Sequence, residues 1–189
     1  MSLKQTPLYE MHQKYGGKII DFGGWALPVQ FAGIIKEHHM VRQKAGLFDV
    51  SHMGEISIRG PRALEFTRYL VTNDVKQIQD KQIIYAPMCY PDGGVVDDLL
   101  VYKFSDDNIF LVVNAANLDK DFAWIKEHAF PDVEVENLSD QYAQLAVQGP
   151  ETDRILQKIS DSDLSSIKFF WFNPEVKIAG VECIVSRTG

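Results

Sequence analysis

One stretch of the chain constrains the fold more than any other, because it places two adjacent aspartates, Asp97 and Asp98, inside a strongly apolar strand pattern over residues 95–104. A strand sends alternate side chains to opposite faces, so the two carboxyl groups point to opposite sides. The predicted companions are Val96, Leu100, Tyr102 and Phe104 for Asp98, and Val95, Leu99, Val101 and Lys103 for Asp97. Both faces are apolar, and we therefore expect a strand that is covered on both sides.

Two interpretations of this aspartate pair stay open, because burying an uncompensated carboxylate is costly and needs a reason. In the structural interpretation, the aspartates accept backbone N–H bonds or pair with Lys103. In the functional interpretation, one carboxylate faces a ligand pocket and accepts a hydrogen bond from the ligand. Asp98 is the better candidate for that role, since its face also offers the aromatic ring of Tyr102.

The patterns around this strand predict an α+β protein. Residues 55–59 alternate as a strand, Gly60-Pro61 opens a helix, and Asn117 can cap a second helix. Further strands are predicted over residues 81–90, 95–104 and 109–113 and from residue 133, so that two helices pack on one face of a largely antiparallel sheet. Outside this region we expect a helix over residues 34–45, a new section from residue 143 and a hairpin over residues 176–185.

Composition excludes several classes of function. The chain has 19 Lys and Arg against 26 Asp and Glu, a formal charge of -7, which disfavours a nucleic-acid partner. No apolar run reaches the roughly 18–20 residues that span a bilayer, so no membrane role is expected. Cys89 and Cys183 lie far apart and outside any Cys-x-x-Cys pair, which indicates reduced thiols in a cytoplasmic protein and no metal site.

Two further groups carry weaker signals. Asp49, Ser51 and His52 are close in sequence, but a hydrolase triad assembles through the fold, and we expect Asp49 and Ser51 to hold a tight turn instead. Met53 can line a pocket or fill the core. Asn114 can satisfy backbone groups, or its amide can bind a planar heterocycle with complementary donors and acceptors.

Taken together and in order, several motifs resemble the aminomethyltransferases of the glycine cleavage system, the T-proteins. The motifs are Thr6-Pro7-Leu8-Tyr9, Asp21-Phe22-Gly23-Gly24-Trp25, Gly46-Leu47-Phe48-Asp49-Val50-Ser51-His52-Met53-Gly54, the stretches 93–102 and 112–117, and Ser186-Arg187-Thr188-Gly189. The resemblance implies a ferredoxin-like second domain over residues 55–137, inserted in a discontinuous first domain of residues 1–54 and 138–189. The family's third domain would be absent from this chain, which we expect to be an N-terminal part.

The resemblance also implies an activity and a set of residues. The implied reaction moves the methylene of an aminomethyl-lipoyl H-protein to tetrahydrofolate and releases ammonia. Asp98 would be the catalytic carboxylate, and the folate co-substrate would be bound, without a metal, by Met53, Tyr85, Asp98, Tyr102 and Asn114. The implied partner is the lipoylated H-protein. The alternatives are a related folate-binding protein without this activity, or a non-catalytic module that binds the H-protein.

Overall fold

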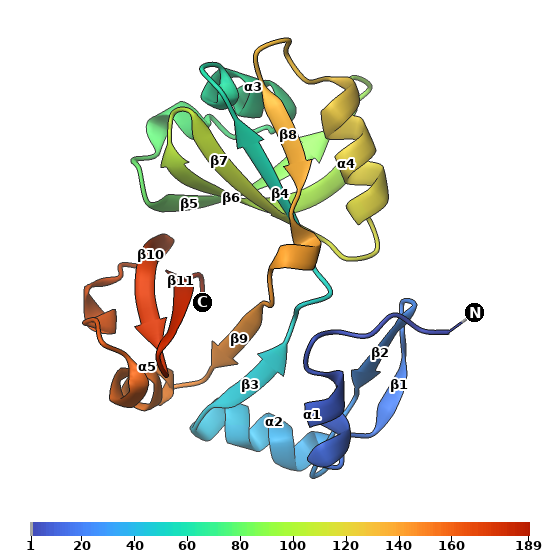
Figure 1. Ribbon diagram of the computed structural model, residues 1–189, viewed down its shortest axis with the longest axis vertical. Coiled ribbons are helices and arrows are strands. Elements are labelled where there is room, and N and C mark those ends of the chain that lie inside the picture. The colour runs from blue at the N-terminus through green and yellow to red at the C-terminus, as the bar shows by residue number, and fades with distance from the viewer. Residues whose placement is uncertain (1) are drawn as a thin grey trace. The chain divides into compact units, whose positions relative to one another are not determined.

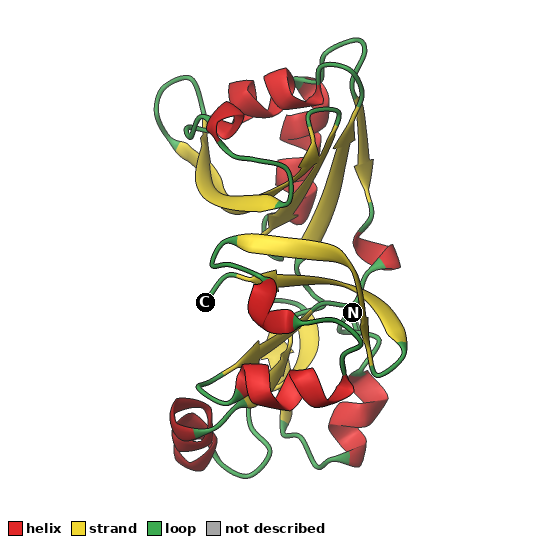
Figure 2. Cartoon of the chain, turned by 90° about the vertical axis from the view of Figure 1, so that its left-hand side faces the viewer, coloured by secondary structure: helices red, strands yellow, loops and turns green. Residues whose placement is uncertain are grey.

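The computed structural model describes residues 2–189, and the chain divides into two compact units. The first unit contains the residues up to His52 together with Ala143–Ile159, and the second contains Met53–Tyr142 together with Ser160–Gly189. Figure 1 shows the ribbon of each unit, and Figure 2 shows the same chain by secondary structure.

The first unit is built from short elements. They are α1 (Tyr9–Lys14), β1 (Ile19–Phe22), β2 (Trp25–Pro28), α2 (Ile34–Gln43), β3 (Gly46–Asp49), β9 (Leu145–Gln148), α5 (Thr152–Leu156) and the 3-10 turn η3 (Gln157–Ile159). β1 and β2 form an antiparallel hairpin, and β3 pairs with β9 across nearly a hundred residues of sequence. The predicted helix over residues 34–45 is confirmed as α2, and the section predicted from residue 143 contains β9.

A buried polar network holds the end of β3. The carboxylate of Asp49 accepts hydrogen bonds from the Thr6 hydroxyl at 2.6 Å and the Ser51 backbone N–H at 3.0 Å, and it lies 2.8 Å from Nε2 of His12. The Ser51 hydroxyl bridges to the backbone of Gln144. The prediction that Asp49 and Ser51 hold a tight turn is therefore confirmed.

The second unit is organised around one sheet in the order β11-β10-β5-β6-β7-β4-β8, in which every pairing is antiparallel. Its elements are β4 (Gly54–Arg59), α3 (Ala63–Leu70), η1 (Val75–Gln77), β5 (Gln82–Cys89), β6 (Val95–Ser105), β7 (Asn108–Val113), α4 (Leu118–Glu127), β8 (Glu134–Asn137), η2 (Ser139–Gln141), η4 (Leu164–Ser166), β10 (Trp171–Ile178) and β11 (Val181–Arg187). The alternation of strands and helices predicted from residue 55 to residue 137 is confirmed.

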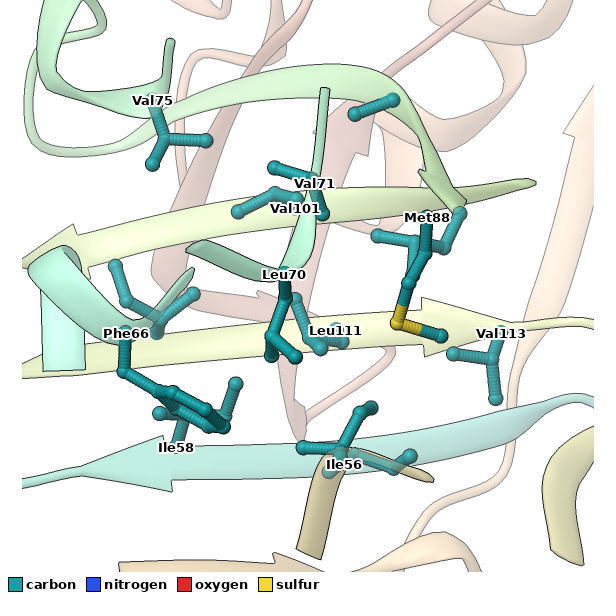
Figure 3. Packing of buried hydrophobic residues seen from close by; sticks show 14 of the residues in the cluster. Ile56, Ile58, Phe66, Leu70, Val71, Val75, Met88, Val101, Leu111 and Val113 are labelled. Carbon is teal, nitrogen blue, oxygen red and sulfur yellow. The ribbon is translucent and has the colours of Figure 1, made fainter. Parts of the chain in front are cut away.

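The two helices cover one face of this sheet. Phe66 and Leu70 of α3 and Ile125 of α4 are buried against Ile56, Leu111 and their neighbours in a single apolar cluster. Figure 3 shows the α3 side of this cluster, where Phe66 and Leu70 lie over Ile58, Leu111 and Ile56. Burial of these side chains removes apolar surface from water, which is the dominant favourable contribution to folding. The core on the helical face fixes which side chains of each strand remain for the opposite face.

The opposite face carries a second, smaller apolar cluster. Its buried members are Ile83, Tyr102, Phe110, Val112, Leu138 and Phe172. Phe172 belongs to β10, which joins β5 through the pairing of Trp171 with Gln82. The contacts thus group Ser160–Gly189 with the second unit, whereas the sequence analysis assigned residues 138–189 to the first domain. The predicted hairpin is confirmed, with Ala179 and Gly180 at its turn in left-handed conformations (φ 51° and 83°).

Candidate functional site

Strand β6 places the two aspartates on opposite faces, as alternation predicts, but in very different surroundings. Asp97 is only 4% exposed, whereas Asp98 is exposed to solvent. Met88 pairs with Asp97 and Cys89 with Val95, so the register shifts at the start of β6. Because of this bulge, Val96 packs in the core on the helical face and does not share the face of Asp98 as expected. The expectation of cover on both sides is likewise wrong at Asp98.

The carboxylate of Asp98 is held by two polar side chains. The Tyr85 hydroxyl donates a hydrogen bond to its Oδ2. Nδ2 of Asn114 lies 3.2 Å from its Oδ1 and 3.0 Å from its backbone carbonyl oxygen. The hydrogen bond to Asp98 raises the pKa of Tyr85, because the phenol serves as the donor and an ionised phenolate would face a carboxylate. Tyr85, Asp98 and Asn114 therefore form one contiguous polar group.

This polar group borders the apolar cluster on the same face of the sheet. Leu100 pairs with Tyr85 on one side and with Val112 on the other, and Tyr102 follows two residues later on the same face. The ring of Tyr102 is buried, and its hydroxyl lies 3.1 Å from Oγ of Ser186 in β11. Burial raises the pKa of the Tyr102 phenol. Met53 packs at the margin of this cluster. All five residues singled out in the sequence thus lie in the second unit, on or beside this face.

Asp97 has the structural role that the sequence analysis left open. Its Oδ2 accepts the backbone N–H of Asn114 at 3.1 Å, and its Oδ1 accepts Nδ2 of Asn114 at 2.9 Å and Nδ2 of Asn117 at 2.7 Å. Asn117 occupies the N-cap position of α4 as expected, but its side chain makes no capping bond. The amide is drawn to the buried carboxylate of Asp97 instead, since a buried ion requires several donors.

Lys103 does not pair with either aspartate. Its ammonium group lies 2.7 Å from Asp106 and 3.5 Å from Asp80 and donates to the carbonyl oxygen of Ile78. The expected pairing fails because Lys103 is six residues beyond Asp97, about 20 Å along an extended strand.

Sequence reasoning also missed Asp121, which is fully buried and lies against Asp97. The usable signal was its spacing, since Asn117 and Asp121 are four residues apart and therefore share one face of α4.

Other features of the described chain lie away from this group. A shallow depression beside α3 is lined by Arg68, Tyr69 and residues 71–74, on the helical side of the sheet. Among residues 2–189, no three potential metal-ligating side chains come together. No helix within the same residues combines the length and the apolar composition needed to cross a bilayer.

The chain matches the model of a known family. Residues 8–189 match the family described as the GCVT N-terminal domain. Because the match extends over nearly the whole chain, the protein belongs to this family.

Curated relatives carry the name aminomethyltransferase. One from Thermoanaerobacter sp. (strain X514) is 59% identical over 189 residues, which is all of this chain and 51% of the relative. Another from Alkaliphilus oremlandii (strain OhILAs) is 57% identical over 188 residues, 99% of this chain and 51% of the relative. The chain therefore spans about half the length of the curated relatives that it matches.

A solved structure shows the same fold. The glycine cleavage system aminomethyltransferase T from Bartonella henselae superposes with a TM-score of 0.85 at 35% sequence identity. The match covers 90% of this chain and 47% of that protein. The chain thus has the mixed helix-and-sheet architecture of an aminomethyltransferase.

Proposed function

We propose that this chain provides the carboxylate-bearing part of a tetrahydrofolate-dependent aminomethyltransferase of the glycine cleavage system. The observation that carries the proposal is the exposed carboxylate of Asp98, fixed by Tyr85 and Asn114 at the margin of an apolar sheet face. The names of the curated relatives and of the solved structure support the same activity. We also propose that the reaction takes place without a metal ion.

The side chains around Asp98 suit a reduced pterin with an aromatic tail. A fused ring system of this kind needs apolar surface beside a small number of polar groups that fix its orientation. The half-exposed ring of Tyr85 and the margin at Met53 offer the surface, and Asp98 and Asn114 offer an acceptor and an amide. The ring of Tyr102 is buried, so Tyr102 would form part of the apolar surface beneath the bound pterin. We propose these five residues as the folate-binding set.

In the proposed reaction, an aminomethyl group leaves the lipoyl sulfur of the H-protein. The carbon–sulfur and carbon–nitrogen bonds of that group break, and the carbon forms two bonds, to N5 and N10 of the folate. The two folate N–H protons pass to the departing ammonia and to the lipoyl sulfur. Asp98 would accept a hydrogen bond from a folate nitrogen and stabilise the positive charge that develops on the transferred carbon.

We further propose that residues 55–137 form a ferredoxin-like domain, and that residues 1–54 and 138–189 belong to a discontinuous first domain. The ferredoxin-like part is supported by the strand and helix order and by the packing of α3 and α4 on a single face of the antiparallel sheet. The discontinuous first domain is supported by the pairing of β3 with β9, whereas the contacts of Ser160–Gly189 lie with the second unit. The apolar face left by these helices is the one that borders Asp98.

The test is Asp98→Asn in the full-length protein, assayed for methylene transfer from lipoylated H-protein to tetrahydrofolate. The amide keeps the shape of the carboxyl group but removes its charge. We expect turnover to fall by about a hundredfold or more, with unchanged circular dichroism and thermal unfolding. Asp119→Asn, at an exposed position of α4, is the matched control and should retain full turnover. Near-normal turnover of Asp98→Asn would refute the assignment.

A second candidate function is a module that binds the H-protein without catalysis. It is favoured by one observation, that the chain spans about half of its relatives' length. Calorimetric titrations of the 189-residue chain discriminate between the two. Binding of tetrahydrofolate supports the folate site, whereas binding of lipoylated H-protein without folate supports the module.

A further inference from the structure

We propose that Asp97 and Asp121 share a single proton as a buried carboxyl–carboxylate pair, and that this pair positions Asn114 and, through it, Asp98. The inference rests on the proposed function, because it assigns two positioning residues to the same site. Neither residue touches the solvent face on which Asp98 lies, so neither is a catalytic residue.

Asp121 has little compensation for a negative charge. Its side chain is 0% exposed, and neither carboxyl oxygen receives a hydrogen bond from an N–H or O–H donor within the described chain. The nearest cation is Lys120, whose ammonium nitrogen is 3.7 Å from Oδ1. That nitrogen donates to the carbonyl oxygen of Val96 instead. An ionised carboxylate in this position would be desolvated and opposed only by this one, partly exposed ammonium group, which disfavours the ionised form.

Asp97, by contrast, is supplied with donors. Three donor groups, from the backbone and side chain of Asn114 and the side chain of Asn117, point at its two oxygens. Both amides must present their NH₂ groups, because every partner on this side is an acceptor. A carboxylate that receives several such bonds is stabilised in its ionised form. The two carboxyl groups are therefore chemically unequal, although they lie in contact.

A single proton on Asp121 satisfies both groups. Burial, followed by the contact with Asp97, raises the pKa of Asp121 to about 8. Burial also raises the pKa of Asp97, but the hydrogen bonds from Asp121, Asn114 and Asn117 outweigh it and lower that pKa. The positive end of α4 favours ionised Asp121, but the loss of hydration at a fully buried site is the larger effect. Near neutral pH the neutral Asp121 donates to ionised Asp97.

The consequence for the site follows from the position of Asn114. Its Nδ2 group lies within hydrogen-bond distance of Oδ1 of Asp97 at 2.9 Å and of the carbonyl and carboxylate oxygens of Asp98 at 3.0 and 3.2 Å. The amide is thus a bridge from the buried pair to the exposed carboxylate. Loss of Asp97 removes the buried acceptor of the Asn114 amide, and loss of the shared proton puts two carboxylates against each other and displaces Asp97. In both cases the anchor of Asn114 is disturbed, and with it one of the two side-chain partners of Asp98.

The first test is independent of folate and uses carboxyl ¹³C and side-chain amide ¹⁵N resonances of the labelled 189-residue chain. We expect Asp121 to be protonated at pH 6 while Asp97 is ionised. We expect Asp121→Ala to shift the Asn114 side-chain amide signals and Asp121→Asn to leave them near the wild-type positions, since an asparagine amide also donates to Asp97. Asp119→Asn is the control. An ionised Asp121 at pH 6, or Asn114 signals that do not respond to Asp121→Ala, would overturn the pair.

The second test measures tetrahydrofolate binding by calorimetry. Asp121→Ala and Asp97→Asn should each raise the dissociation constant about tenfold, and Asp121→Asn should stay within about twofold of the wild type. If Asp121→Ala does not fold, Asp121→Leu removes the same donor with less loss of volume. Unchanged affinity in the folded variants would refute the positioning role. If the wild-type chain itself binds no folate, the proposed function fails for this chain, while the resonance experiment still decides the pair.

Discussion

A buried glutamate in β4 gives the sharpest test of the electrostatics of the second unit. Glu55 pairs with Val112 and is 2% exposed. Both backbone polar groups of Glu55 are hydrogen-bonded: its N–H donates to Oγ of Ser139 at 2.9 Å, and its carbonyl oxygen accepts the N–H of Leu138 at 2.8 Å. Neither oxygen of its carboxyl group has a hydrogen-bond partner within residues 2–189. Burial therefore raises the pKa of Glu55 from 4.5 to about 7.

The sign of the effect follows from proton linkage. Between pH 4.5 and 7 the folded chain keeps a proton on Glu55 that the unfolded chain has already lost. The free energy of unfolding must therefore fall as pH rises through this window, by about 1.4 kcal/mol per pH unit from this group. The shift of the Glu55 pKa thus corresponds to a loss of about 3 kcal/mol, complete slightly above pH 7. The stabilisation is fully present below pH 4.5.

Glu55→Gln removes the ionisation and nearly preserves the shape. Urea unfolding, followed by circular dichroism from pH 5 to pH 8, should give similar stabilities at pH 5. At pH 8 the variant should be more stable by about 3 kcal/mol, an upper estimate because residual solvation lowers it. The raised pKa of Asp121 acts in both proteins and cancels in the difference. Glu136→Gln, at an exposed position of β8, is the control and should follow the wild type. Parallel profiles for Glu55→Gln and the wild type would refute the reasoning.

Two further predictions concern the backbone of the second unit and the polar network of the first. A Cβ atom on Gly60 (φ +124°) would lie 2.3 Å from the carbonyl oxygen of Asp132, whereas one on Gly93 (φ +89°) meets nothing within 4 Å. In thermal unfolding, Gly60→Ala should therefore lose clearly more stability than Gly93→Ala, for which about 1 kcal/mol of backbone strain is expected. Equal losses in the two variants would contradict the backbone clash at Gly60. Asp49→Asn should cost about 1–3 kcal/mol at pH 7. Burial raises the pKa of Asp49, but hydrogen bonds from Ser51, Thr6 and His12 outweigh it and lower that pKa. The loss of stability caused by Asp49→Asn should therefore shrink as pH falls below about 4. A loss that does not change with pH would contradict this prediction.

The sequence by itself determined the elements of the second unit and one face of the candidate site. Period-two alternation over residues 95–104 placed Asp98 with Leu100 and Tyr102, and the capping and proline signals at residues 60–61 and 117 marked the two helix starts within a few residues. These are local properties, because the choice of strand or helix depends on side-chain spacing within about ten residues.

Tertiary structure alone decided which carboxyl groups are buried and what they contact. The bulge in β6 moved Val96 to the helical side, and the approach of α4 to β6 brought Asn114, Asn117 and Asp121 onto Asp97. It also buried Glu55, which the sequence presents only as the start of a strand. Solvation and hydrogen-bond partners depend on segments distant in sequence, so no local pattern encodes them.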